Sequence, residues 1–231
     1  MVQVNSDRLT VRLKFRKTGS LQYVSHLDLV RTMHKIIIRA KLPLYYSEGF
    51  NPKPKMVFAA PLSIGTESLA EFMDLRLSEY VDPTLVMERL NSNMTSEMQI
   101  TEAYYPTAKF TDLKWMTYSI SIKTAGACLE YAHKCRDILL SDSVEVTKNT
   151  KSGEKSVDIR SLIKSVASDF DGEYMTLRAV LSADQSAFLN PELIIKVLRE
   201  KAGILADPDL TREYYSIMRI SAHNGDMTEF R

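Results

Sequence analysis

The chain has 231 residues, of which 45% are hydrophobic and 26% are charged, a composition that is typical of globular proteins and excludes an intrinsically disordered chain. The sequence contains no apolar run of about 18 residues and no signal-peptide pattern, so we expect no membrane span, no membrane partner and a cytoplasmic location. The two cysteines, Cys128 and Cys135, lie about 10 Å apart along the axis of one predicted helix, which is too far for a disulfide. We therefore expect two reduced thiols.

The net charge is only +1, but it is unevenly distributed along the chain. Residues 1–60 contain eleven Lys or Arg and three acidic residues, a net charge of +8, whereas residues 61–113 carry a net charge of −6. A positive surface attracts the phosphate backbone of a nucleic acid. The two segments could instead lie side by side and neutralise each other, and the sequence leaves both interpretations open.

The first 60 residues predict a strand, a helix and a turn-rich segment. Hydrophobic and mainly basic residues alternate over residues 8–17, which indicates a half-buried strand with a basic outer face. Ser25 fits the N-cap of a helix with Asp28 as its capping-box partner, and Pro43 ends that helix. We expect the helix to have an inward stripe of Leu27, Val30, Met33, Ile37 and Ala40. Its outer face then carries Asp28, Arg31, Lys35 and Arg39.

Three further strands and a second helix complete a first unit. Short apolar or alternating segments predict the strands, and Asp82 followed by Pro83 marks the start of the helix. The strands span residues 55–61, 71–78 and 98–105. The order strand, helix, strand, strand, helix, strand is that of the ferredoxin-like fold, in which two helices cover one face of an antiparallel sheet.

The second half of the chain predicts the same order with one insertion. Strands are expected at residues 113–123, 143–148, 174–182 and 213–220, and helices at 125–140 and 190–203. A turn is expected at residues 149–153, and Asp158 fits the cap of a short additional helix. We therefore predict an α+β protein of two tandem ferredoxin-like (βαββαβ) units with antiparallel sheets. Residues 1–108 form the first unit and residues 109–231 the second, which has a helical insertion near 158–169.

Several segments of the sequence resemble a known bacterial family. The runs Y-V-S-H-L-D-L-V-R (23–31), L-P-L-Y-Y-S-E-G-F-N-P-K-P-K (42–55) and A-A-P-L-S-I-G-T-E-S (59–68) are similar to the radical-SAM-linked protein family, a domain of unknown function. The runs D-I-R (158–160) and L-N-P-E-L (189–193) fit this family as well. Its members occur beside, or fused to, radical SAM proteins with a cobalamin-binding-like domain, often near genes for ribosomal proteins. The resemblance implies a radical SAM partner and a context in RNA modification or ribosome maturation, and it implies no particular reaction.

Signals for catalysis or metal binding are few. His26 and His34 are eight residues apart and can share one side of the predicted helix, but a helical metal site normally uses i, i+4 spacing. The sequence contains no C-x-x-x-C-x-x-C run, no P-loop and no G-x-G-x-x-G motif, so the chain holds no radical SAM cluster itself. We expect no metal and no cofactor, and His26 and His34 are the candidate acid/base residues.

The segment around residues 49–52 combines aromatic and basic side chains. It could be an ordinary turn whose neighbouring tyrosines lie in the core. Alternatively, exposed rings could stack on unpaired bases while lysines and arginines bind phosphates. On the second interpretation, the RNA-binding residues are Arg31, Lys35, Arg39, Tyr46, Phe50, Asn51, Lys53 and Lys55.

We therefore predict a non-catalytic RNA-binding or adaptor protein that acts with a radical SAM enzyme, with tRNA or rRNA as the expected RNA. One alternative is a metal-independent endoribonuclease that uses a histidine as general acid/base and a lysine to hold the phosphate. The other is a protein-interaction module that only docks on the radical SAM partner. The sequence leaves the identity of the RNA and the oligomeric state open.

Overall fold

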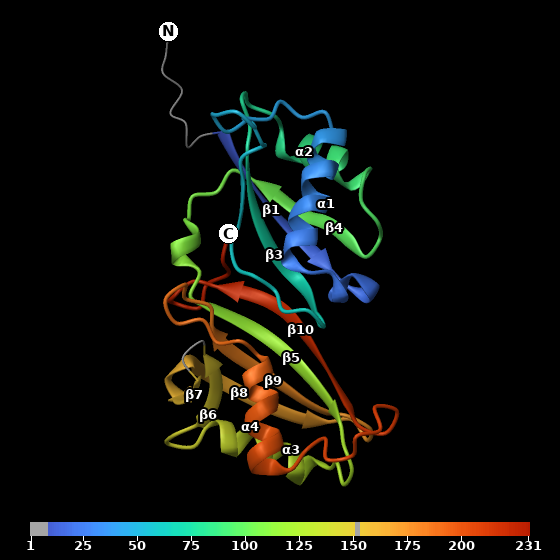
Figure 1. Cartoon of the computed structure of the whole chain (residues 1–231), viewed down its shortest axis with the longest axis vertical. Helices are drawn as coiled ribbons and strands as arrows, with labels where there is room; N and C mark the ends of the chain where they lie inside the picture. Colours follow the sequence, from blue (N-terminus) through green and yellow to red (C-terminus); the bar gives the residue numbers. More distant parts are fainter. Residues whose placement is uncertain (1–8, 151–152) are drawn as a thin grey trace. The chain divides into compact units, whose positions relative to one another are not determined.

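The computed structural model describes residues 9–150 and 153–231, so that Arg8 of the predicted first strand and Lys151 and Ser152 of the predicted turn lie outside the described residues. The chain divides into unit 1, which comprises Met1–Asp112 and Phe230–Arg231, and unit 2, which comprises Leu113–Glu229 (Figure 1). The predicted boundary after residue 108 precedes the short 3-10 helix η3 (Phe110–Asp112), which belongs to unit 1. The described residues form a mixed α+β protein with four α-helices and antiparallel strand pairs.

Unit 1 contains its elements in the predicted βαββαβ order. They are β1 (Thr10–Lys17), α1 (His26–Arg39), β2 (Met56–Phe58), β3 (Thr66–Arg76), α2 (Pro83–Asn91) and β4 (Met98–Tyr104). Strand β1 lies between β4 and β3 and is antiparallel to both, and β2 pairs with the opposite side of β3. Buried side chains from α1, α2 and the three long strands form one hydrophobic cluster, so both helices cover the same face of the sheet.

Helix α1 begins where the capping signal predicts it. The Ser25 Oγ accepts a hydrogen bond from the Asp28 backbone N–H at 3.2 Å and donates to Asp28 Oδ2 at 2.7 Å. These bonds satisfy one of the N–H groups that a helix start leaves without an intrahelical partner, which contributes about 1 kcal/mol. The position of α1 along the sequence is therefore explained by local chemistry.

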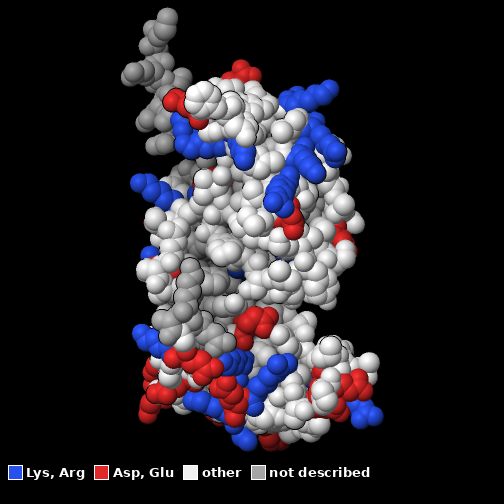
Figure 2. Space-filling view, in the orientation of Figure 1, with Lys and Arg blue, Asp and Glu red and all other residues white. Residues whose placement is uncertain are grey.

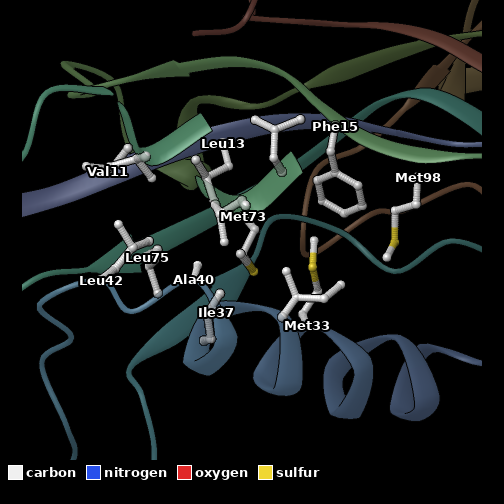
Figure 3. Close-up of a cluster of buried hydrophobic side chains, with 14 of the residues drawn as sticks. Val11, Leu13, Phe15, Met33, Ile37, Ala40, Leu42, Met73, Leu75 and Met98 are labelled. Atoms are coloured by element: carbon white, nitrogen blue, oxygen red, sulfur yellow. The ribbon is translucent and has the colours of Figure 1, made fainter. Parts of the chain in front are cut away.

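The buried stripe of α1 differs in part from the prediction. Met33, Ile37 and Ala40 face the sheet as predicted and pack against β1 and β3 (Figure 3). Leu27 is 67% exposed, and the prediction for it was wrong. The reason is that Leu29 and Ile36 lie on the same face of the helix as these three residues and complete the buried stripe. Leu27 lies about 200° around the helix from Leu29 and therefore points away from the sheet. The buried members of α1 are Leu29, Met33, Ile36 and Ile37, followed by Ala40 at the C-cap.

Unit 2 contains a four-stranded sheet and a separate two-stranded sheet. Its elements are β5 (Trp115–Lys123), α3 (Leu129–Leu139), β6 (Glu145–Thr150), β7 (Gly153–Asp158), β8 (Ile163–Phe170), β9 (Met175–Ser182), α4 (Glu192–Ala202) and β10 (Tyr214–His223). The main sheet has the order β10–β5–β9–β8, and β6 pairs only with β7. Helix α3 packs on β8 and β9 and contacts α4. Neither Cys128 nor Cys135 forms a disulfide in the described part of the chain.

The predicted helical insertion near 158–169 was wrong. A short 3-10 helix (Arg160–Leu162) is followed by strand β8, which covers the rest of the segment that was predicted to be helical. The register of β8 against β9 shifts between Ile163 and Ser165. This bulge adds one residue to the strand, so Ile163 and Val166 are both buried although they are three residues apart. An apolar spacing of three is also typical of a helix, which explains the error.

No helix in residues 9–150 and 153–231 is long and apolar enough to cross a membrane.

Candidate functional site

The basic residues of β1 do not form the open surface that the alternation predicts. Arg12 is 1% exposed, and its Nε and Nη2 donate to the two carboxylate oxygens of Asp74 at 2.8 and 2.9 Å. Lys14 Nζ donates to Glu102 Oε1 at 2.7 Å. Asp74 lies directly opposite Arg12 on β3, and Glu102 lies opposite Lys14 on β4. On β1, acidic residues of the neighbouring strands therefore neutralise Arg12 and Lys14.

The cations of α1 have a different environment. Arg31, Lys35 and Arg39 are exposed and lie four residues apart, so that they form one row along the outer face of the helix. Arg31 Nη1 contacts Asp28 Oδ1 at 3.0 Å, and both side chains stay open to solvent. Within the described residues, Lys35 and Arg39 form no ion pair. Figure 2 shows Lys and Arg side chains gathered over α1 on this face of unit 1.

A hairpin-like loop carries the predicted aromatic residues. The Ser47 backbone N–H donates to Lys53 O at 2.9 Å, and the Lys53 N–H donates to Ser47 Oγ at 3.1 Å, which closes the loop around residues 48–52. At its tip, Phe50 is fully open to solvent and Asn51 is exposed, and Tyr46 is 44% exposed. In this loop, Gly49 has a φ of 118°, which L side chains rarely adopt.

The two candidate histidines line one groove. His26, Val30 and His34 recur every four residues along α1 and form one wall, as their spacing predicts. The facing wall comes from the chain after the loop, and the groove has a volume of about 430 Å³. Its other lining residues are Lys53, Pro54, Met56, Phe58 and Pro61. The groove therefore places both histidines and one predicted RNA-binding residue, Lys53, around a largely apolar surface.

The facing wall is fixed by the sheet and the core. Met56 and Phe58 alternate with the exposed Val57 on β2, so both point to the α1 side, where they pack against the hydrophobic cluster of unit 1. The Phe58 ring makes an edge contact with the His26 ring, with 5.4 Å between the ring centroids and 81° between the planes. The aromatic part of the groove is therefore preorganised. No pattern in the sequence marks Val30, Met56, Phe58 and Pro61 as site residues, because their convergence depends on the pairing of β2 with β3.

The electrostatic environment of the groove favours a neutral His34. Burial lowers the pKa of His34, and the positive charge of Lys53 lowers it further. His34 is therefore mainly uncharged at pH 7, where one nitrogen of its ring donates a hydrogen bond and the other accepts one. No acidic residue lines the described walls. Among the described residues, no group of three or more His, Cys, Asp or Glu could hold a metal ion.

The predicted RNA-binding residues occupy three places in unit 1. Lys53 lies in the groove, whereas Lys35 follows His34 on α1 and points about 100° away from it. Arg31 and Arg39 share the outer face with Lys35. Tyr46, Phe50, Asn51 and Lys55 belong to the loop and its closing segment and do not line the groove. Lys53 and Lys55 are exposed and, like Lys35, form no ion pair with a described residue.

A protein-family model matches most of the chain. A family described as "Uncharacterized protein conserved in bacteria (DUF2344)" matches residues 10–191. No curated protein matches the sequence.

Solved structures provide a likeness of fold. A chain of the structure described as "Crystal Structure of a Cbf5-Nop10-Gar1 Complex" matches with a TM-score of 0.50 and 9% identity, covering 94% of this chain and 50% of that one. A chain of an archaeal box H/ACA sRNP Nop10-Cbf5 complex matches with a TM-score of 0.46 and 10% identity, over 93% of this chain and 48% of that one. A chain of an H/ACA RNP bound to a substrate RNA containing 2′-deoxyuridine matches with a TM-score of 0.48 and 9% identity, over 97% of this chain and 50% of that one. The chain spans about half the length of the chains it matches, and at this identity the likeness concerns the fold alone.

Proposed function

This chain belongs to the uncharacterised bacterial family whose model it matches, and we propose that it is a non-catalytic RNA-binding or adaptor protein. The observation that carries the proposal is the row of exposed cations on α1 together with the exposed loop. Lys35 and Arg39 have no acidic partner among the described residues, so their charge is available to a phosphate backbone. Phe50 offers a ring with both faces open to an unpaired base.

We also propose that the two units are tandem ferredoxin-like units, which divide near residues 108 and 109. The strand order β4–β1–β3–β2 in unit 1 and the order β10–β5–β9–β8 in unit 2 become equivalent when the β6–β7 hairpin is treated as an insertion. In unit 1, both helices cover one face of the sheet. The α1 side, which carries the cations, is thus presented by a rigid scaffold.

The partner that we propose besides RNA is a radical SAM protein with a cobalamin-binding-like domain. The support for this partner is the resemblance of residues 23–31, 42–55 and 59–68 to the radical-SAM-linked family. An adaptor of this kind would hold tRNA or rRNA for an enzyme that carries the reactive cluster. Co-purification of the tagged chain with such an enzyme, before and after nuclease treatment, tests whether RNA bridges the two.

The decisive experiment is a charge reversal on α1. The double variant Arg31→Glu/Lys35→Glu is expected to lower the affinity for single-stranded RNA at least tenfold and to flatten its dependence on salt concentration. The matched control, Lys134→Glu/Lys201→Glu, makes the same change at exposed residues of unit 2 and is expected to bind as the wild type does. Equal affinities for all three proteins would contradict the proposal. If the wild type itself bound no RNA but co-purified with the enzyme, a protein-interaction module would be the better description.

One observation favours a second candidate function, metal-independent RNA cleavage. The groove brings His26, His34 and Lys53 together, and a mainly neutral His34 is suited to act as a general base. Incubation of RNA with the purified chain in EDTA tests this candidate. Cleavage that is lost in His34→Ala and kept in His133→Ala, a histidine of unit 2, would support an enzyme. Intact RNA in every sample would leave the binding role as the better description.

A further inference from the structure

The groove between α1 and β2 has the surface of a small-ligand site. About 430 Å³ lies within the range of about 300–1,000 Å³ that such sites occupy. Five of its eight lining residues are apolar, namely Val30, Pro54, Met56, Phe58 and Pro61. The polar groups are two imidazoles and one ammonium group, all of which can donate hydrogen bonds, and no carboxylate lines the described walls. The site therefore suits a ligand with an apolar planar part and a negative charge.

We infer that this groove binds a single unpaired nucleotide of the RNA, with its base against Met56 and Phe58 and its phosphate at Lys53. This inference rests on the proposed RNA-binding function and names the place where one base is held. Unpaired bases are commonly stacked on Phe and His side chains. The Lys53 ammonium group forms no ion pair with a described residue, so a phosphate is the complementary charge that it lacks.

The geometry supports this arrangement because the apolar wall is already fixed in place. The Phe58 ring is held between two aromatic neighbours, with centroid distances of 6.2 Å to Phe15 and 5.4 Å to His26. The Phe58 side chain therefore loses little conformational entropy when a ligand binds. His34 lies two helical turns from His26 in the same groove, next to the charge of Lys53. A ring that enters the groove meets apolar side chains, and the attached phosphate meets the basic residue.

The first test uses the wild-type chain and needs no substitution. Uridine 5′-monophosphate, uridine and inorganic phosphate are titrated separately into the protein while the imidazole signals of His26 and His34 are followed by NMR. We expect the nucleotide to shift both signals and to bind more tightly than either of its parts. Equal binding of inorganic phosphate and the nucleotide would overturn the inference, because the base would then make no contact. The absence of any shift with the nucleotide would overturn it as well.

The second test fills the groove without changing its charge. Val30→Trp is expected to lower the affinity for a short single-stranded RNA about tenfold, because the base loses its place, and to reduce the salt slope by no more than about 0.7, the contribution of the one phosphate at Lys53. The matched control is Ile38→Trp, a 54% exposed position on the same helix that does not line the groove, and it should bind as the wild type does.

The two tests distinguish this inference from the proposed function. If Val30→Trp binds RNA as well as Ile38→Trp does, the nucleotide site is wrong, and a loss of affinity in Arg31→Glu/Lys35→Glu would still support RNA binding on α1. If RNA affinity is unchanged in every variant, both proposals fail. If Val30→Trp does not fold, the nucleotide titration of the wild type decides. If Val30→Trp still binds RNA but no longer co-purifies with the enzyme partner, the groove binds a segment of that protein, and the inference is overturned.

Discussion

Strand β1 and helix α1 both carry several cations of the first quarter of the chain, but the structure leaves only those of α1 available. On β1, Arg12 and Lys14 bind carboxylates on the neighbouring strands at 2.8 and 2.7 Å. On α1, Lys35 and Arg39 lie in the open with no ion pair to a described residue. The same residue types, less than 30 residues apart in the chain, thus serve stability in one element and are free for a ligand in the other.

The difference follows from where each element lies in unit 1. A strand between two others has a residue directly opposite each of its own on both sides, so an acidic residue at the same register meets the cation. A helix packed on one face of a sheet buries one stripe and leaves its outer half in solvent. A high density of positive charge along the sequence is therefore a poor guide to a binding surface. Whether the cations are available depends on whether their element lies inside the sheet or on its surface.

The largest effect is expected from Arg12→Ala on β1. Removal of the guanidinium group leaves Asp74 without its partner and also removes a cation that contacts the rings of Phe110 and Phe230 at 4.3 and 4.9 Å. We expect the free energy of unfolding to fall by about 3 kcal/mol, measured by urea denaturation. Lys35→Ala on α1 is the control and should change it by less than about 0.5 kcal/mol. Similar losses in the two variants would contradict the contrast between β1 and α1.

The second prediction concerns the start of the helix that displays the cations. Ser25→Ala removes the hydrogen bond between the Ser25 Oγ and the Asp28 N–H, and we expect a loss of about 1 kcal/mol in the free energy of unfolding. Ser25→Thr keeps a hydroxyl at the cap and should recover most of that loss. A full-size loss in Ser25→Thr would show that the cap is not the source of the effect.

The third prediction makes the same substitution in both elements. Lys35→Gln is expected to weaken single-stranded RNA binding about threefold and to reduce the salt slope by about 0.7, because one phosphate contact is lost. Lys14→Gln removes a charge that Glu102 already neutralises, so RNA affinity should stay within error of the wild type. Fluorescence anisotropy at several salt concentrations measures both quantities. A larger effect for Lys14→Gln would mean that the β1 side contacts the RNA.

Much of the fold of unit 1 could be predicted because its signals are local. The alternation of residues 8–17, the Ser25 cap and the Asp82–Pro83 helix start each act within a few residues. The helix predicted near 158–169 failed because a bulge in β8 gives a strand the apolar spacing of a helix. A β-bulge depends on how a strand pairs with its neighbour, and a single sequence does not contain that information.

The candidate site could be predicted only as separate pieces. Helical spacing alone places His26 and His34 on one side of α1, and the groove confirms it. The position of Lys53 in the same groove depends on β2, a strand of three residues that pairs with β3 and so places the preceding loop next to the helix. The prediction of a basic outer face for β1 was wrong for the same reason. Asp74 and Glu102 lie beside the cations of β1 only because β3 and β4 pair with that strand.

The smallest expected effect, from Asp28→Asn, has opposite signs for stability and for RNA binding. The hydrogen bond that Ser25 donates to the Asp28 carboxylate, and then the one that Arg31 donates to it, hold the pKa of Asp28 below its usual value. A carboxyl whose pKa is lower in the folded state stabilises the fold above its unfolded pKa and loses this contribution as the pH falls through the folded pKa. The stability difference between wild type and Asp28→Asn should therefore be constant near neutral pH and shrink below about pH 4.

The same substitution should strengthen RNA binding at neutral pH. It removes a negative charge from the outer face of α1 and releases Arg31 from its ion pair, so that this guanidinium group becomes as available as Lys35. Urea denaturation between pH 3 and pH 7, together with RNA titration at pH 7, measures the two effects on one protein. Asp137→Asn on α3, where Arg136 is the ionic partner, is the control and should leave RNA affinity unchanged. A decrease of RNA affinity in Asp28→Asn would show that Arg31 and its neighbours on α1 do not face the RNA.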